Sequence, residues 1–99
     1  MIGEISITPV GSDATSMRGY VDEAVQAIRE SGVVFRVTEM GTNVEGSLDD
    51  ILRAFRAAHD ACVSRGAGRI LASLRIDDRL DQPERLEPVP VEASAGPWH

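Results

Sequence analysis

Two hydrophobic periodicities alternate along this chain, and the order in which they occur limits its fold more than any other feature. Apolar residues occupy alternate positions up to Pro9 and then recur at every third or fourth position in the segment that follows. The first spacing is typical of a half-buried strand and the second of an amphipathic helix. Continued along the chain, the two spacings predict the order strand, helix, strand, strand, helix, strand. The approximate bounds of these elements are 4–9, 15–31, 33–37, 42–46, 48–65 and 70–76.

The residues between the periodic segments support this order. Pro9 cannot donate a hydrogen bond to a ladder and is followed by turn-forming residues, so the first strand ends there. Ser47 followed by Asp50 has the spacing of a capping box at the start of the second helix, and Gly66 suits the end of that helix. The two middle strands are separated by a short turn and are therefore expected to form a hairpin.

This order of elements is that of an α+β, ferredoxin-like βαββαβ fold. Right-handed crossovers place both helices on one face of a four-stranded antiparallel sheet, in which the spatial order of the strands is fourth, first, third, second. A chain of 99 residues is too short for two domains, so residues 1–81 are expected to form one ferredoxin-like domain. Residues 82–99 are rich in proline and are expected to form a loosely ordered tail.

Charge and cysteine content exclude several classes of partner and site. The chain has ten arginines, no lysine and sixteen acidic residues, for a net charge of -6. Nucleic acids and anionic membranes are bound through clustered cations, whereas these arginines are scattered. Cys62 is the only cysteine, so an internal disulfide is excluded. Because neither a targeting segment nor a long apolar run is present, we expect a cytoplasmic protein without membrane insertion.

Alternation within the predicted strands divides their side chains between two faces of the sheet. The face toward the helices receives Ile5, Ile7, Val33, Phe35, Val37, Val44, Ile70, Ala72, Leu74 and Ile76. The face without helices receives Glu4, Ser6, Thr8, Arg36, Thr38, Asn43, Glu45, Leu71, Ser73 and Arg75. Antiparallel sheets commonly expose such a polar face to water, but a ligand or a second copy of the chain can also use it. The sequence leaves these alternatives open.

Several motifs within residues 2–79 resemble those of the small thiamine-binding family of ferredoxin-like proteins. The most specific is Met40-Gly41-Thr42-Asn43-Val44-Glu45-Gly46, which follows a predicted strand and precedes a capped helix. The others are Ile5 to Gly11, Tyr20-Val21, His59, Gly66 to Arg69 and Arg75 to Arg79. The resemblance implies a non-enzymatic binder of thiamine or its hydroxymethylpyrimidine part. It also implies a cytoplasmic homodimer or homotetramer formed through sheet packing.

Thiamine is a cation that carries an aminopyrimidine, so its site needs hydrogen-bonding groups, surface for flat rings and a negative charge. Glu45 is the candidate acid, Met40 offers a polarizable ring contact, and Arg75 suits a phosphate-bearing ligand such as thiamine phosphate. Glu45 can instead accept from backbone N–H groups before the second helix, and Arg75 can instead pair with Glu4 across strands. The candidate ligand-binding residues are Ser6, Thr8, Thr38, Met40, Thr42, Asn43, Glu45 and Arg75.

Two other classes of function remain open. The first is a self-associating interaction domain without a small ligand, which the outward position of Leu71 favours. The second is a small enzyme on the same fold, which would need a nucleophile, a base or a phosphate-binding loop. The spacing of residues indicates none of these, so no catalytic residue and no cofactor are predicted. The acidic residues of segment 77–81 lack calcium-loop spacing, so no metal ligand is predicted either.

Overall fold

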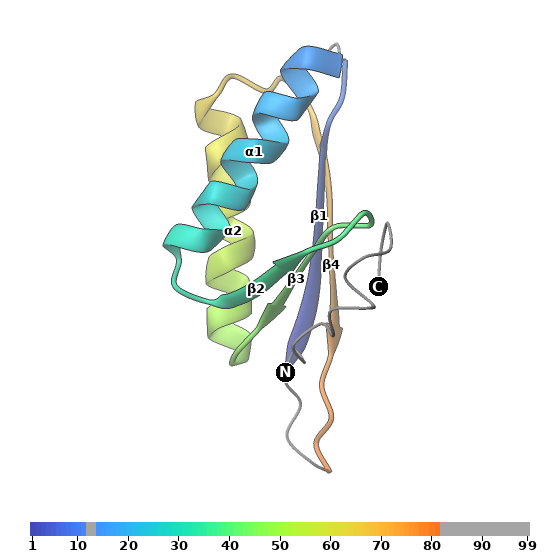
Figure 1. The fold of residues 1–99 in the computed structure, drawn as a ribbon, viewed down its shortest axis with the longest axis vertical. Coiled ribbons are helices and arrows are strands. Elements are labelled where there is room, and N and C mark those ends of the chain that lie inside the picture. The colour runs from blue at the N-terminus through green and yellow to red at the C-terminus, as the bar shows by residue number, and fades with distance from the viewer. Residues whose placement is uncertain (12–13, 82–99) are drawn as a thin grey trace, which may run out of the picture.

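The computed structural model describes residues 1–11 and 14–81, and it confirms the predicted order of elements. The tail predicted for residues 82–99 lies outside the described residues. Within the described ranges, no helix has the length and apolar character needed to cross a membrane. The elements are β1 (Ile2–Pro9), α1 (Ala14–Glu30), β2 (Val34–Val37), β3 (Thr42–Glu45), α2 (Leu48–Ser64) and β4 (Ile70–Asp77), as Figure 1 shows.

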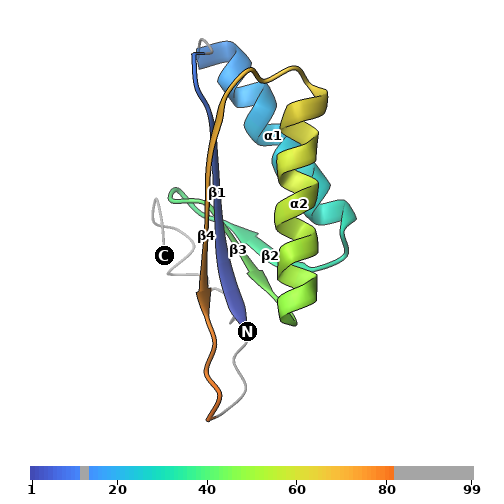
Figure 2. The ribbon, with the colours of Figure 1, turned by 180° about the vertical axis from the view of Figure 1, so that it is seen from behind.

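The four strands form one antiparallel sheet in the order β2-β3-β1-β4, which confirms the predicted ferredoxin-like topology. β1 pairs with β4 along its whole length, from Ile2 opposite Asp77 to Pro9 opposite Ile70. Its pairing with β3 is shorter and ends at Ile5. Figures 1 and 2 show that both helices cover the same side of the sheet and that the β2–β3 hairpin diverges from β1. We call the opposite side of the sheet the open face.

The core lies between the sheet and the two helices. Ile51 of α2 and Val44 of β3 are fully buried at its centre. Ala54 and Ala58 of α2 are also fully buried, and their small side chains allow the helix to pack closely. Gly3 makes room on β1 for this helix, because a Cβ atom at Gly3 would lie 3.0 Å from Cγ2 of Ile51. Close packing of α2 on β1 and β3 therefore depends on small residues in both layers.

The helices do not cover the whole face against which they pack. Val37 at one edge of the sheet remains 53% exposed, and Ile76 at the other edge remains 41% exposed. Ala72, on the same strand as Ile76, is also exposed. The expectation that these three side chains pack against the helices is therefore wrong. The helices shield mainly the central strands, so the two edge strands keep apolar side chains in contact with solvent.

A capping box fixes the start of α2, as the sequence predicts. The Ser47 hydroxyl accepts from the Asp50 N–H at 3.1 Å, and the Asp50 carboxylate accepts from the Ser47 N–H at 3.1 Å. The guanidinium of Arg53 also donates to this carboxylate, at 3.0 Å. These hydrogen bonds hold the pKa of the Asp50 carboxyl below its ordinary value of 3.8. The largest contribution comes from the bond donated by the Ser47 N–H. The ionised carboxylate therefore stabilises the folded state.

Replacing Asp50 with asparagine is expected to lower the melting temperature at pH 7 and to have a much smaller effect near pH 2. A carboxyl with a lowered folded-state pKa contributes its stability above its ordinary pKa and loses it as pH falls through the lowered pKa. Thermal melts of the parent and the variant between pH 2 and pH 7 test this expectation. Asp49→Asn is the control, because Asp49 lies in the same helical turn. An equal effect of Asp50→Asn at both pH values would contradict the role of the charge.

Candidate functional site

A notch opens where the β2–β3 hairpin leaves β1. The last paired residues of β1 and β3 are Ile5 and Thr42, beyond which the hairpin turns away from the sheet. Gly41 crosses β1 closely at this point, because a Cβ atom placed on it would lie 2.5 Å from the carbonyl oxygen of Ile5. Its φ of +154° belongs to a region that favours glycine. The divergence of the hairpin thus begins at a position that only glycine occupies without strain.

This notch is one end of a cavity of about 220 Å³, which we call the hairpin cavity. β1 and the hairpin tip supply its polar side chains, and α1 supplies apolar side chains that close it. Val21 and Val25 project from α1 at helical spacing, so one face of that helix forms the apolar wall. The lining residues are Ile5, Ser6, Ile7, Thr8, Val21, Ala24, Val25, Ile28, Val37, Thr38, Glu39, Met40, Gly41, Thr42 and Ala58.

The β1 backbone also directs polar groups toward the hairpin side. Gly46 N–H donates to the Met1 carbonyl at 3.1 Å, so the odd-numbered residues of β1 direct their N–H and C=O groups toward β3. The ladder between these strands ends at Ile5. Ile7 is the next residue with this orientation, and it lines the cavity. The alternation therefore directs one backbone donor and one backbone acceptor into the notch.

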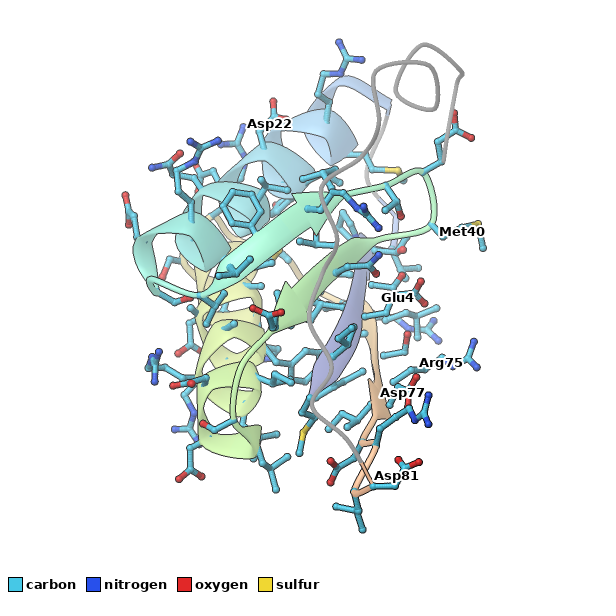
Figure 3. The ribbon with its side chains drawn as sticks, turned by 60° about the horizontal axis from the view of Figure 1, so that its bottom comes forward. Glu4, Asp22, Met40, Arg75, Asp77 and Asp81 are labelled. Carbon is cyan, nitrogen blue, oxygen red and sulfur yellow. The ribbon has the colours of Figure 1, made fainter. Side chains whose placement is uncertain are left out.

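Five of the predicted ligand-binding residues line the hairpin cavity, namely Ser6, Thr8, Thr38, Met40 and Thr42. The Thr38 hydroxyl donates to the Gly41 carbonyl at 3.0 Å and accepts from the Met40 N–H at 3.1 Å, so it also shapes the hairpin tip. Thr42 is only 5% exposed, since it lies where the hairpin meets β1. Met40 is exposed at the tip of the hairpin, as Figure 3 shows.

The other three predicted residues, Asn43, Glu45 and Arg75, do not line this cavity. Asn43 lies between Glu4 and Arg36 on neighbouring strands, and Arg75 lies opposite Glu4. Arg36, Asn43, Glu4 and Arg75 thus form a polar row across the open face. Figure 3 shows the labelled side chains of Glu4 and Arg75 on the same side of the sheet. The predicted set is therefore divided between the hairpin cavity and the open face.

Arg75 lines a second, smaller hollow of about 190 Å³, formed where β1 and β4 lie side by side. Its other lining residues are Ile2, Gly3, Glu4, Ile76 and Asp77. Arg75 is opposite Glu4, which matches the alternative interpretation of Arg75 as a cross-strand partner. Among residues 1–11 and 14–81, this hollow included, no cluster of three or more His, Cys, Asp or Glu side chains is placed to hold a metal ion. The hairpin cavity is the better candidate for a ligand site, because it gathers five of the predicted ligand-binding residues and this hollow has only Arg75.

The sequence-based prediction missed three features of the hairpin cavity. Glu39 places a carboxylate in the lining next to Met40, but it belongs to neither a strand nor the quoted motif. The backbone groups of Ile7 carry no residue signature, because every residue type has them. The apolar wall contributed by Val21 and Val25 lies on a helix, whereas the predicted ligand-binding residues all lie on the strands and the hairpin. Two of the three had a usable signal, because Glu39 is the acid that directly precedes the Met40-Gly41-Thr42 motif and Val21 belongs to the Tyr20-Val21 motif.

The site contains no reactive thiol. Cys62 is fully buried on α2, and burial raises the pKa of its thiol, with a further contribution from the charge of Glu23. A thiol with a raised pKa is mostly protonated at neutral pH and is a poor nucleophile. Its position on the buried face of α2 therefore makes it a packing residue.

Comparisons with known proteins agree with this architecture. A family model for thiamine-binding proteins matches residues 3–89. A UPF0045 protein of Methanothermobacter thermautotrophicus is 38% identical over 79 residues, covering 79% of this chain and 80% of the relative. The crystal structure of a hypothetical protein of Methanocaldococcus jannaschii is 35% identical, with a TM-score of 0.78 and 86% coverage of both chains. A Bacillus cereus domain of unknown function is 30% identical, with a TM-score of 0.75, and the similarity covers 86% of this chain and 81% of that one. The chain belongs to the thiamine-binding protein family.

Proposed function

We propose that this protein binds thiamine, or a compound that shares its aminopyrimidine ring, in the hairpin cavity. The proposal rests on one observation, which is that polar and apolar surfaces meet in this cavity. The diverging hairpin exposes polar groups of β1 and of its own tip, while α1 supplies an apolar wall. Binding sites for small molecules commonly combine an apolar lining with a few placed polar groups. Membership of the family supports a binding role for this chain.

The size of the cavity suits one ring better than the whole of thiamine. Its volume of about 220 Å³ is below the ~300–1,000 Å³ that is usual for a pocket enclosing a drug-sized ligand. We therefore place the aminopyrimidine inside and the charged thiazolium at the mouth. The N–H and C=O of Ile7 offer an aminopyrimidine the donor and acceptor that it needs. Val21 and Val25 of α1 provide surface for the flat ring.

The mouth of the cavity suits a cation. Glu39 is exposed and brings a carboxylate to the hairpin tip, and the thioether of Met40 lies beside it. A carboxylate near a thiazolium lowers the energy of the charged ligand, and a thioether makes favourable contacts with rings. In this proposal Glu39 takes the charge-offsetting role that the sequence assigns to Glu45. In this proposal Asn43, Glu45 and Arg75 lie outside the ligand site, on the open face.

We propose that the protein binds its ligand without transforming it, and that it does so in the cytoplasm as a homo-oligomer. Two exposed apolar side chains on the open face support self-association, since Val34 is 55% exposed and Leu71 is 56% exposed. Self-association without a small ligand is the second candidate function, and the same two residues favour it. Ligand binding requires the hairpin cavity, whereas self-association without a ligand does not use it.

Thiamine and hydroxymethylpyrimidine are expected to raise the melting temperature, whereas a thiazole control is not. A ligand at 100 times its dissociation constant stabilises by about 2.7 kcal/mol, which shifts the melting temperature of a domain this size by about 10 °C or more. Thermal melts with the four compounds, thiamine phosphate included, test the proposal. If no pyrimidine-bearing compound shifts the melt, the proposed function is wrong and self-association becomes the better interpretation.

A matched pair of variants distinguishes the hairpin cavity from the open face. Glu39→Gln is expected to weaken thiamine binding up to about fivefold, the range of a solvent-exposed ion pair, and to leave the neutral hydroxymethylpyrimidine unaffected. Glu45→Gln, which removes the same charge from the open face, is expected to leave both affinities unchanged. Isothermal titration calorimetry measures both affinities. The reverse pattern would place the ligand on the open face, with Glu45 as the acid.

A further inference from the structure

The middle of α1 borders the hairpin cavity, which lies between it and the polar groups of β1 and the hairpin. Val21 and Val25 form the apolar wall of the cavity, and Val21 remains 41% exposed. Figures 1 and 2 show α1 and α2 side by side on the sheet, and α1 packs more extensively against α2 than against any strand. The position of this wall therefore depends mainly on the contacts that α1 makes with α2.

Arg65, which follows the last turn of α2, makes one of these contacts. Its guanidinium donates to the Glu23 carboxylate of α1 at 2.8 Å, and its Cζ atom lies 5.4 Å from the centre of the Tyr20 ring. Tyr20 is buried, and its carbonyl accepts from the Cys62 thiol of α2 at 3.9 Å. The C-terminal end of α2 is thus attached to the turn of α1 that carries Val21.

Gly19 leaves the space on α1 that the Arg65 guanidinium occupies. A Cβ atom at Gly19 would collide with Nη2 of Arg65 and would lie 2.7 Å from its Cζ atom. Gly19 lies inside α1 and its φ is not positive, so the backbone conformation does not require glycine. Glycine in a helix interior is destabilising relative to alanine. The packing of the guanidinium gives a physical reason for glycine at this position.

We infer that Arg65 is a positioning residue for the hairpin cavity. Its guanidinium lies on Gly19 and contacts Tyr20 and Glu23. These contacts hold the turn of α1 that carries Val21 at a fixed distance from β1. Arg65 is not among the residues that line the cavity, so it acts on a ligand only through α1. This effect on a ligand rests on the proposed function, whereas the hold on α1 requires no ligand.

Gly19→Ala separates positioning from stability. Alanine favours the helix but displaces the guanidinium, so the gain in helix propensity offsets the lost contacts and the midpoint of urea unfolding is expected to stay near that of the parent. Thiamine binding is nevertheless expected to weaken about fivefold, a usual size for a change that reaches a site through intervening contacts. Urea unfolding and isothermal titration calorimetry measure the two quantities.

Arg65→Gln tests the hold on α1 without a ligand, and Arg53→Gln is its matched control. Arg53 is also an exposed arginine of α2, but it donates to the Ser31 carbonyl at 3.2 Å, beyond the C-terminal end of α1. In Arg65→Gln the Val21 amide is expected to exchange its hydrogen about tenfold faster, because an ion pair and a cation–π contact are lost together. Arg53→Gln is expected to leave the exchange of the Val21 amide and the thiamine affinity unchanged.

The two measurements distinguish failure of this inference from failure of the proposed function. Unchanged exchange of the Val21 amide in Arg65→Gln would overturn the inference, as would parent-like thiamine affinity in both Gly19→Ala and Arg65→Gln. Equal losses of affinity in Arg65→Gln and Arg53→Gln would also overturn it, because they would show general destabilisation. A parent protein that does not bind thiamine would contradict the proposed function, and the exchange of the Val21 amide would still decide whether Arg65 holds the wall.

Discussion

Replacing Ile51 with alanine is expected to lower the free energy of unfolding by about 3–4 kcal/mol. Ile51 has no solvent exposure and sits on Gly3, where α2 packs against the centre of the sheet. Truncation there loses the transfer free energy of the removed carbon atoms and leaves a cavity lined by side chains with little freedom to move inward. Urea unfolding measures the change, and the melting temperature is expected to fall by about 15 °C or more.

Leu52→Ala provides the control for this prediction. Leu52 is the next residue of the same helix and is 45% exposed, so it has the same helical context and little core contact. Its truncation is expected to cost less than about 1 kcal/mol. A similar cost for both variants would show that α2 does not pack on β1 through Ile51. The difference between them therefore measures how much stability the burial of the Ile51 side chain confers.

The order of elements could be predicted from the sequence because each element carries its own local signal. Pro9 ends β1, and Ser47 with Asp50 begins α2, at the places the sequence indicates. The extent of helix coverage could not be predicted in this way. Val37 and Ile76 have the alternation of inward-facing residues, and they do face the helices. Their exposure depends on how wide the helix layer is, which no local pattern reports.

The candidate site was predictable only in part, for a related reason. Alternation identified polar side chains such as Ser6 and Thr8 on β1, and both line the hairpin cavity. The cavity itself exists because β3 stops pairing with β1 after Ile5, which is a property of the path of the hairpin in space. The backbone groups of Ile7 gain their importance from that path alone. The sequence thus predicts which polar side chains β1 carries, but it does not predict where the pairing of β1 with β3 ends.

Replacing Gly41 with alanine is expected to lower the free energy of unfolding by more than about 2 kcal/mol and to abolish the thermal shift with thiamine. The added Cβ would meet the Ile5 carbonyl at 2.5 Å, and the φ of +154° disfavours any side chain. Such backbone strain costs about 1–3 kcal/mol before the collision is counted. Urea unfolding and thermal melts with thiamine measure the two effects on one protein.

Gly66→Ala is the control that separates the backbone strain of a positive φ from the collision between a Cβ atom at position 41 and the Ile5 carbonyl. Gly66 also has a positive φ, of +103°, but no atom lies within 4 Å of the position that a Cβ would take. This variant is expected to cost about 1 kcal/mol and to keep the thiamine shift intact. If Gly41→Ala were no more destabilising than Gly66→Ala, the hairpin would tolerate a different path past Ile5.

The stability of Gly41→Ala and its thermal shift with thiamine are most informative when they are compared. If the variant loses stability but retains thiamine binding, the hairpin moves without affecting the ligand, and the site lies elsewhere, with the open face as the next candidate. Loss of both effects is expected, because the displaced hairpin carries Glu39, Met40 and Thr42 away from β1. Gly41 then determines both where the β1–β3 ladder ends and whether the backbone of Ile7 faces the hairpin cavity. The fold and the binding site would depend on the same close contact between two backbones.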